Sequence, residues 1–268
     1  MTRIGLITGS GTYELPGLSG ARSTRVVTRF GDVEVNHGDW HGLEVLHIAR
    51  HGVGHIRLSS AVNHRANVTA LKALRADCVI GMTVCGAIDP MLQLGSLVIF
   101  DDLHFTANRL PDGSLCTLFD EIGAAERGHW VYHGSPFSPG LRELLAQAAS
   151  AGGDVFQAGG VYGHVDGPRF NTAVEIAQLA AAGVSAVSQT GGPEAVLCGE
   201  ALLPFALVGY VTDYANGVKP DDPTSPEKLL ELIGHARSAF LNLLESALPL
   251  ISIGAGTIKP VGTVLRSG

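Results

Sequence analysis

The sequence predicts one α/β domain built around a central, mixed β-sheet. Short apolar segments typical of buried strands alternate with longer segments whose apolar residues recur at helical spacing. The chain of 268 residues is long enough to bury a substantial core without disulfides or metal ions. Because no linker, internal repeat or low-complexity stretch divides it, we expect a single domain over residues 1–268, with a flexible tail over 260–268.

The first half of the chain is rich in strand signals. An apolar run at Ile4–Thr8 ends in a glycine turn and predicts a buried strand. Three β-like segments at hairpin spacing follow, at Val26–Phe30, Val33–Asn36 and Leu43–Ile48. Apolar residues at helical spacing then predict an amphipathic helix over Ser59–Leu74. Two further strands are expected at Cys78–Val84 and Ser96–Asp101.

The second half alternates helices with strands. Asn108–Tyr132 has weak periodicity and is expected to be a long functional loop. Thr172, with Glu175 three residues later, has the pattern of a helix capping box. The expected helices are Pro139–Ala151, Thr172–Ala182, Pro193–Leu202 and Pro226–Leu248, and the expected strands are Gly160–Val165, Ala186–Gln189 and Ala206–Thr212.

Composition excludes several functional classes. The chain has 18 basic and 25 acidic residues and no basic run, which argues against nucleic-acid binding. Its apolar stretches are shorter than the roughly 20 residues that span a bilayer, and Met1–Gly9 does not resemble a signal peptide, so we expect no membrane association and a cytoplasmic location. Only 16% of residues are charged, against about 25% usually. We therefore expect a homo-oligomer.

Two segments could bind an anion. Gly9-Ser10-Gly11-Thr12 follows the first strand, where glycines let backbone N–H groups approach an anion and a hydroxyl adds a donor. The alternative is a tight turn without a ligand. Arg50-His51 follows another strand and suits an oxyanion or phosphate clamp, or else is an ordinary surface pair. His51 and His55 also have metal-ligand spacing, but the glycines between them argue against the helix it needs, so no metal is expected.

Polar residues also follow three later strands. Thr83, Thr190 and Asp213 each stand where a buried strand meets a loop, which is where open α/β sheets bind ligands. A carboxylate directly after a strand as apolar as Ala206–Thr212 is costly unless it is hydrogen-bonded. Asp213 is therefore the best candidate for proton transfer, the alternative being a turn or N-cap aspartate. The four cysteines show no C-x-x-C spacing, and Cys85 is expected to be a core residue.

Together these segments resemble the trimeric purine nucleoside phosphorylase and methylthioadenosine phosphorylase family, over about Ile4 to Pro249. The resemblance rests on five strings: Arg50-His51-Gly52-x-x-His55, Val62-Asn63-His64-Arg65-Ala66-Asn67, Gly167-Pro168-Arg169-Phe170, Pro193-Glu194-Ala195 and Thr212-Asp213-Tyr214. It implies a partly barrel-like sheet and a homotrimer or hexamer. It also implies that inorganic phosphate attacks C1′ of a purine nucleoside, with no cofactor or metal.

The resemblance also assigns site residues. It places phosphate at Ser10, Arg50, His51, Thr83, Val84 and Thr190, with Arg50 supplying the charge. Asp213 would donate a hydrogen bond to N7 of the leaving purine and accept one from a 6-amino group, whereas relatives selective for 6-oxopurines carry Asn there. The remaining substrate-binding positions are Phe170, Asn171, Gln189, Ala215, Pro226 and Leu229, with Trp130 and His133 reaching a neighbouring subunit's pocket.

Three positions depart from the family pattern. Ala215 replaces a second aspartate, Gln189 replaces a methionine that packs under the ribose, and Asn171 stands where 6-oxo-specific members place Glu. Because Pro226 and Leu229 are apolar, the expected substrate is 5′-methylthioadenosine. The alternatives are a phosphorylase of 6-oxopurine nucleosides or 5′-methylthioinosine and, more remotely, a nucleoside-binding homologue that has lost catalysis.

Overall fold

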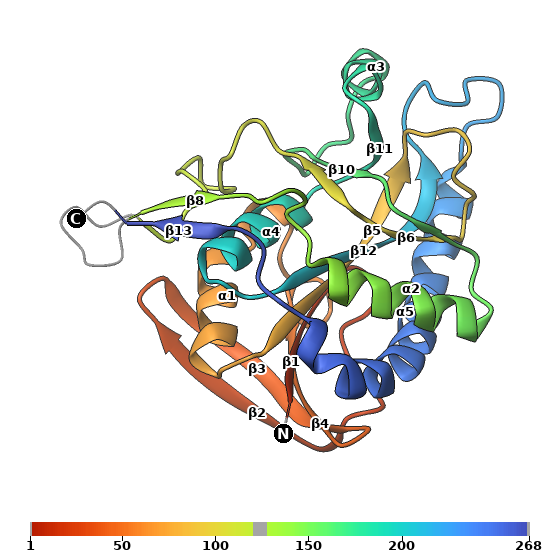
Figure 1. Ribbon diagram of the computed structural model, residues 1–268. Helices are drawn as coiled ribbons and strands as arrows, with labels where there is room; N and C mark the ends of the chain where they lie inside the picture. The colour runs from red at the N-terminus through yellow and green to blue at the C-terminus, as the bar shows by residue number, and fades with distance from the viewer. Residues whose placement is uncertain (1, 120–127, 267–268) are drawn as a thin grey trace.

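The computed structural model (Figure 1) describes residues 2–119 and 128–266 of the chain. Within these residues the main sheet has 11 strands, and parallel and antiparallel pairings are mixed as the sequence predicts. The strands are β1 (Arg3–Thr8), β2 (Ser19–Thr28), β3 (Gly31–Trp40), β4 (Leu43–Ala49), β5 (Cys78–Ala87), β6 (Leu97–Ile99), β7 (Asp102–His104), β9 (Phe156–Ala158), β10 (Val161–His164), β11 (Val184–Ser188) and β12 (Phe205–Tyr214).

The sheet forks at β5. One path runs β2-β3-β4-β1-β5-β11-β10-β7, and a second branch adds β12, β6 and β9. Along one edge of β5, residues 78–81 pair with β1 and residues 86–87 pair with β11, whereas β12 pairs along residues 79–87. The carboxyl ends of β1, β4, β5 and β12 point the same way, because all of their mutual pairings are parallel. The loops that follow these strands therefore meet at one edge.

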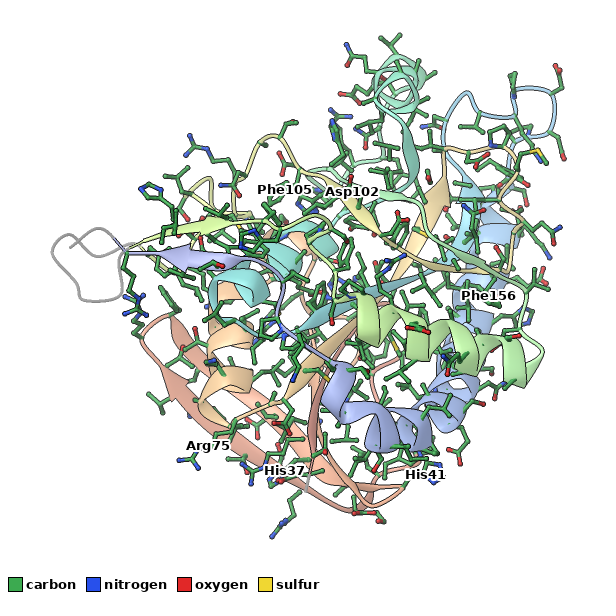
Figure 2. All side chains as sticks on the ribbon, viewed as in Figure 1. His37, His41, Arg75, Asp102, Phe105 and Phe156 are labelled. Atoms are coloured by element: carbon green, nitrogen blue, oxygen red, sulfur yellow. The ribbon has the colours of Figure 1, made fainter. Side chains whose placement is uncertain are left out.

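Two pairs of helices cover the sheet, and side chains fill the space between the layers (Figures 1 and 2). On one side α1 contacts α4, and on the other α2 contacts α5 along much of its length. The helices are α1 (His64–Ala73), α2 (Pro139–Gly152), α3 (Ala173–Ala181), α4 (Gly191–Glu200) and α5 (Pro226–Gly254), and short 3₁₀ turns lie at Ser59–Ala61 and Ala255–Thr257.

Capping residues set several helix boundaries. The Asn63 side chain accepts a hydrogen bond from the Ala66 N–H, so α1 begins at His64 rather than at Ser59 as expected. At α3 the expected capping box is confirmed: Thr172 accepts from the Glu175 N–H, and Glu175 accepts from the Thr172 N–H. The start of α1 therefore lies more than one turn later than the hydrophobic pattern predicts, because that pattern does not reveal the capping hydrogen bond.

The last helix, α5, is long and apolar enough to cross a membrane by length and composition, with a mean hydropathy of 1.4 over 18 residues. Here one face is buried against α2 and β12, through residues from Leu232 to Ile251. It continues through Pro249 rather than ending at Leu248. Through this face α5 covers one side of the sheet, and 33% of its apolar window is buried.

Two segments that were expected to lack regular structure each contain a short strand. Thr263–Leu265 forms β13, which pairs antiparallel with β8 (His129–Val131), within the segment 260–268 whose flexibility stays a prediction. The same pairing ends the expected loop Asn108–Tyr132 in a strand, while residues 120–127 and 267–268 of these two segments lie outside the described part. Only three residues pair in each strand, too few for a periodic signal, and their partners lie more than a hundred positions apart.

Candidate active site

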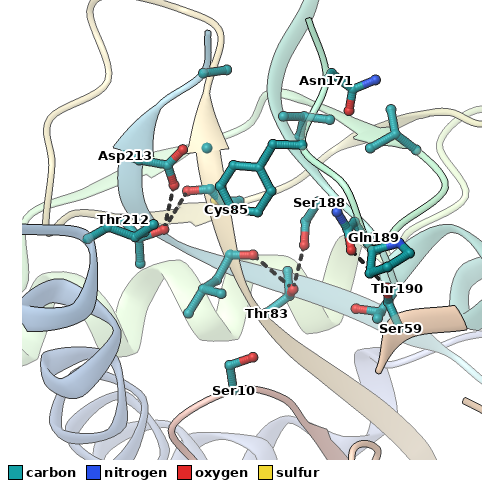
Figure 3. A pocket seen from close by; sticks show the side chains of 18 of the residues that line it. Ser10, Ser59, Thr83, Cys85, Asn171, Ser188, Gln189, Thr190, Thr212 and Asp213 are labelled. Carbon is teal, nitrogen blue, oxygen red and sulfur yellow. Dashed lines mark hydrogen bonds between the residues drawn. The ribbon is translucent and has the colours of Figure 1, made fainter. Parts of the chain in front are cut away.

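The candidate site is a pocket of about 280 Å³ at the carboxyl ends of the central strands (Figure 3). Strands β5, β11 and β12, the loops after β1 and β4, and helix α5 all contribute to its wall. Eleven of the predicted site residues line it: Ser10, His51, Thr83, Val84, Phe170, Asn171, Gln189, Thr190, Asp213, Ala215 and Leu229. The strand-end pattern in the sequence therefore identifies a real cavity.

Hydroxyl groups gather at one end of the pocket. Thr83 Oγ1 lies 3.0 Å from Ser188 Oγ, and Ser10 faces them across the pocket (Figure 3). Thr190 is the N-cap residue of α4, but its side chain makes no cap hydrogen bond. The Tyr162 hydroxyl instead accepts from the Gly191 N–H at 2.9 Å. The Thr190 hydroxyl is therefore available to a ligand, beside the positive end of the α4 dipole.

His51 brings an imidazole to the same end. Its Nδ1 lies 2.9 Å from the Arg57 carbonyl oxygen, and because a carbonyl only accepts, Nδ1 carries the proton. Burial, then Arg50 and His55, lower the pKa of His51 to about 4, although the bond to Arg57 opposes this. His51 is therefore neutral near pH 7, and its Nε2 is a hydrogen-bond acceptor. The His55 ring stacks on it at 4.4 Å.

Arg50 is placed differently from the prediction. Its side chain is fully buried behind the pocket wall, where Nε and Nη2 donate to the Glu194 carboxylate at 2.6 and 2.8 Å. Nη1 donates to the Met82 carbonyl and Nη2 to the Ile7 carbonyl, so four of its five N–H groups are engaged. A Cβ on Gly9 would lie 2.5 Å from Nη1, so only glycine lets the Ser10 loop approach the guanidinium.

The ion pair changes the electrostatics of this end. Glu194, the middle residue of the Pro193-Glu194-Ala195 string, neutralises the charge that Arg50 was expected to supply. Burial raises the pKa of Glu194, whereas Arg50 opposes that rise. A dianion bound here would therefore rely on hydroxyls, backbone N–H groups and the α4 dipole as well as on the remaining Arg50 N–H.

Asp213 occupies the other end of the pocket. A bulge in β12 places Asp213 opposite Gly86 of β5, with Thr212 as the extra residue. The Thr212 hydroxyl lies 2.8 Å from Asp213 Oδ1 and 3.3 Å from the Cys85 carbonyl (Figure 3). Burial raises the pKa of Asp213, although the Thr212 hydroxyl opposes this. The geometry favours a carboxyl group that can hold a proton inside the pocket.

Two amides form the rim near Asp213. Asn216 Nδ2 donates to the Asn171 carbonyl at 2.7 Å, and Asn171 Nδ2 lies 3.3 Å from Glu175 Oε2. Each of these bonds uses an amide nitrogen and leaves the side-chain oxygen available. Ala215 is small and buried, and Phe170, 61% exposed, forms the outer edge.

Helix α5 closes the pocket with apolar side chains. Leu229 lines the wall as predicted, but Pro226, the first residue of α5, is exposed and lies off the wall. Ile233, one turn beyond Leu229, lines the wall as well. Leu229 and Ile233 share one face of α5, whereas Pro226 is exposed at the tip of the helix.

Trp130 and His133 lie away from this pocket. The Trp130 indole donates to the Val261 carbonyl at 3.1 Å, and His133 Nε2 lies 2.8 Å from Thr263 Oγ1. Trp130 instead lines a second hollow of about 550 Å³, together with Asp102 and Phe105 (Figure 2). Their expected contribution to a neighbouring subunit's pocket stays a prediction.

Several lining residues carried no sequence signal of their own. Ser59, from the 3₁₀ turn before α1, and Ser188, at the end of β11, both reach the pocket. In the sequence these are ordinary loop and strand serines. In the folded chain Ser59 donates a hydrogen bond to Gln189, and the Ser188 hydroxyl lies within hydrogen-bond distance of that of Thr83. Among residues 2–119 and 128–266, no cluster of three or more His, Cys, Asp or Glu could hold a metal ion.

A pocket with hydroxyl groups and a helix N-terminus at one end, a carboxyl group at the other and apolar walls between them suits an enzyme that joins a small anion to an organic substrate. Residues 3–249 match the phosphorylase superfamily. The chain is 34% identical over 255 residues to a probable 6-oxopurine nucleoside phosphorylase of Thermococcus kodakarensis, covering 94% of this chain and 93% of that protein. The chain thus belongs to the phosphorylase superfamily, as a purine nucleoside phosphorylase.

Two further comparisons extend this result. An S-methyl-5′-thioadenosine phosphorylase of Cereibacter sphaeroides is 34% identical over 218 residues, covering 80% of this chain and 71% of that protein. A methylthioadenosine phosphorylase from Schistosoma mansoni, solved in complex with adenine, superposes with a TM-score of 0.83 at 25% identity, covering 96% and 97% of the two chains. The fold and the reaction class are shared across both groups.

Proposed function

We propose that this chain is a phosphorylase of 6-oxopurine nucleosides, with Asp213 as the proton donor to the leaving base. The observation that carries the reaction is the polarity of the pocket, with free hydroxyls and the α4 N-terminus at one end and a buried carboxyl at the other. Phosphate bound at the first end would lie below C1′ of a sugar whose base reaches the second.

The proton balance of the reaction fits these two ends. Monohydrogen phosphate attacks C1′ through an unprotonated oxygen, the bond from C1′ to the purine nitrogen breaks, and its electron pair goes to the purine. The purine gains the proton that the phosphate finally loses. Because His51 Nε2 is an acceptor, it can accept a hydrogen bond from the phosphate hydroxyl, whose proton finally goes to solvent, while a protonated Asp213 supplies one to N7. Solvent then restores the proton of Asp213.

Electrostatics explains why both ends are needed. The sugar becomes oxocarbenium-like as the bond to the base breaks, and phosphate below it stabilises the positive charge. Negative charge develops on the purine at the same time. A donor fixed within a dry pocket stabilises that charge without a reorganisation cost, which is the role proposed for Asp213.

The rim favours a 6-oxopurine as the base. A 6-oxopurine carries a hydrogen on N1, whereas N1 of adenine only accepts. The side-chain oxygens of Asn171 and Asn216 are acceptors at this rim, because their nitrogens hold the Glu175 carboxylate and the Asn171 carbonyl. The similarity to the Thermococcus kodakarensis protein, over almost the whole of both chains, supports the same choice.

Phosphorolysis of 5′-methylthioadenosine is the second candidate. The apolar side chains of Leu229 and Ile233 suit a 5′-methylthio group better than a hydroxyl. A carboxyl at position 213 can also accept a hydrogen bond from a 6-amino group while donating to N7. The similarity to the Cereibacter sphaeroides and Schistosoma mansoni proteins supports this candidate.

A panel of four nucleosides separates these candidates. With inosine, adenosine, 5′-methylthioinosine and 5′-methylthioadenosine, we expect kcat/KM for the two 6-oxopurines to exceed that for the 6-aminopurines by at least about 10-fold, because one mismatched hydrogen bond is worth about 1–3 kcal/mol. Release of free base, measured with and without phosphate, gives the rates. Faster cleavage of 5′-methylthioadenosine would favour the second candidate, and no release from any nucleoside would indicate a homologue that only binds.

A further inference from the structure

The Gln189 side chain is held in one orientation by two hydrogen bonds. Its Nε2 donates to the Arg169 carbonyl at 3.0 Å, and because a carbonyl only accepts, this bond fixes which end of the amide is nitrogen. Its Oε1 then accepts from the Ser59 hydroxyl at 2.8 Å (Figure 3). The backbone supports this arrangement: a Cβ on Gly167 would lie 2.0 Å from Oε1, so only glycine fits there.

The fixed amide keeps hydrogen-bonding capacity for a ligand. An amide has two N–H groups and two oxygen lone pairs, and the two bonds use one of each. Gln189 makes no other hydrogen bond to residues 2–119 or 128–266, and it lines the pocket. One donor and one acceptor therefore remain, held at a set spacing by the planar amide.

The position of Gln189 defines which part of the substrate it meets. It directly precedes Thr190, whose free hydroxyl belongs to the anion-binding end, and it is remote in sequence and in the pocket from Asp213 at the base end (Figure 3). Phosphate attacks C1′, so the sugar lies next to the phosphate. Gln189 therefore lies at the level of the sugar rather than of the base.

We propose that Gln189 recognises the vicinal 2′,3′-diol of the sugar, so that the enzyme selects ribonucleosides over 2′-deoxyribonucleosides. This inference rests on the proposed phosphorolysis and adds its sugar specificity. A cis-diol can donate through one hydroxyl and accept through the other, which complements the remaining acceptor and donor of the amide. A thioether at this position would contact the sugar without distinguishing ribose from 2′-deoxyribose. Ser59 is a positioning residue, because it acts on the sugar only through Gln189.

Rejection of the deoxy sugar follows from the cost of an unpaired polar group. A site built to hydrogen-bond a substrate hydroxyl discriminates against an analogue that lacks it by up to about 10⁴–10⁵-fold when it is fully buried. Gln189 is only half-buried, so water can partly replace the missing hydroxyl. We therefore expect kcat/KM for inosine to exceed that for 2′-deoxyinosine by about 100-fold.

The test compares inosine with 2′-deoxyinosine in the wild type and in Gln189→Met. The substitution keeps the length of the side chain and removes the amide. We expect the preference for inosine to fall from about 100-fold to below about 10-fold, mainly through slower cleavage of inosine. Ser59→Ala should lower the preference less, because the amide loses its orientation but not its polar atoms. Asn171→Ala removes a different amide of the same pocket and should leave the preference unchanged.

Equal cleavage of the two nucleosides by the wild type would overturn the inference, as would a preference that survives in Gln189→Met. The dissociation constants of inosine and 2′-deoxyinosine, measured by calorimetry without phosphate, test the same recognition independently of turnover. Suppose that no nucleoside is cleaved, but that the wild type binds inosine about 100-fold more tightly than 2′-deoxyinosine and Gln189→Met does not. The proposed reaction then fails and the diol recognition stands.

Discussion

Replacing Asp213 with alanine is expected to lower kcat/KM for phosphorolysis by about 10²–10³-fold, the usual effect of removing one donor to a developing charge. The loss should appear in kcat as much as in kcat/KM, because the purine carries little negative charge before the bond from C1′ breaks. Nucleoside binding should change little by comparison. Single-turnover release of base, measured at saturating phosphate, checks this result.

The sign of the pH dependence follows from the protonation state. Burial raises the pKa of Asp213, and only the protonated carboxyl can donate to N7. Activity is therefore expected to be full below the pKa of Asp213 and to fall as the pH rises through it. In Thr212→Val the carboxylate loses a hydrogen bond that stabilises its charged form, so this alkaline limb should move to higher pH.

Asp213→Asn serves as the matched variant, since an amide keeps the donor but does not titrate. The alkaline limb assigned to Asp213 should then disappear, and the ratio of inosine to adenosine cleavage should rise, because the second N–H of the amide can donate to a 6-oxo oxygen whereas a 6-amino group offers it no acceptor. An alkaline limb that is unchanged in both Asp213→Asn and Thr212→Val would contradict the assignment of this proton to Asp213.

The sequence predicts the site best where one residue and its local strand are sufficient. Thr83 and Asp213 lie in the carboxyl-terminal halves of the apolar strands β5 and β12, which are parallel neighbours and so bring both side chains to one edge of the sheet, and Thr190 follows β11. The orientation of Arg50 could not be found in this way. Its partner Glu194 lies 144 positions away, and no local pattern indicates which carboxylate will meet a buried guanidinium.

The same distinction holds for the fold. Long elements such as α5 and β12 have apolar runs that identify the element, whichever residue is taken as its end. The three-residue strands β7 and β9 have no periodicity to detect and exist only because β10 and β6 offer them an edge. The Gln189 contact shows the consequence for specificity, since Ser59 is 130 positions away and only the folded chain reveals that the amide is fixed.

Acid is expected to destabilise the protein strongly between pH 6.5 and about 4.5, because four buried histidines stay neutral in the folded state. Burial, assisted by Arg50, lowers the pKa of His47 and His51 to about 4 and that of His64 well below its usual value. Burial alone lowers the pKa of His164 to about 3. In the unfolded chain these groups bind protons near pH 6.5, so the unfolded state gains four protons that the folded state does not.

Two buried acids oppose this effect. Burial raises the pKa of Asp213 and, against the opposing effect of Arg50, that of Glu194, so each carboxyl that is protonated in the folded state offsets one of the four histidine protons. The net difference is then at least about two protons, or a loss of roughly 3 kcal/mol or more in the free energy of unfolding per pH unit as the pH falls. Urea unfolding followed by circular dichroism at several pH values measures this slope.

His64→Phe isolates one contribution to that slope. Both ring nitrogens of His64 are buried without a hydrogen-bond partner among the described residues, and Nδ1 lies 3.8 Å from Glu194 Oε1. A phenyl ring of similar shape therefore loses no hydrogen bond, and the slope should decrease by one proton, about 1.4 kcal/mol per pH unit. If His64→Phe left the slope unchanged, His64 would have to be protonated in the folded core, beside Glu194, and the charge balance behind the anion-binding end would be positive rather than neutral.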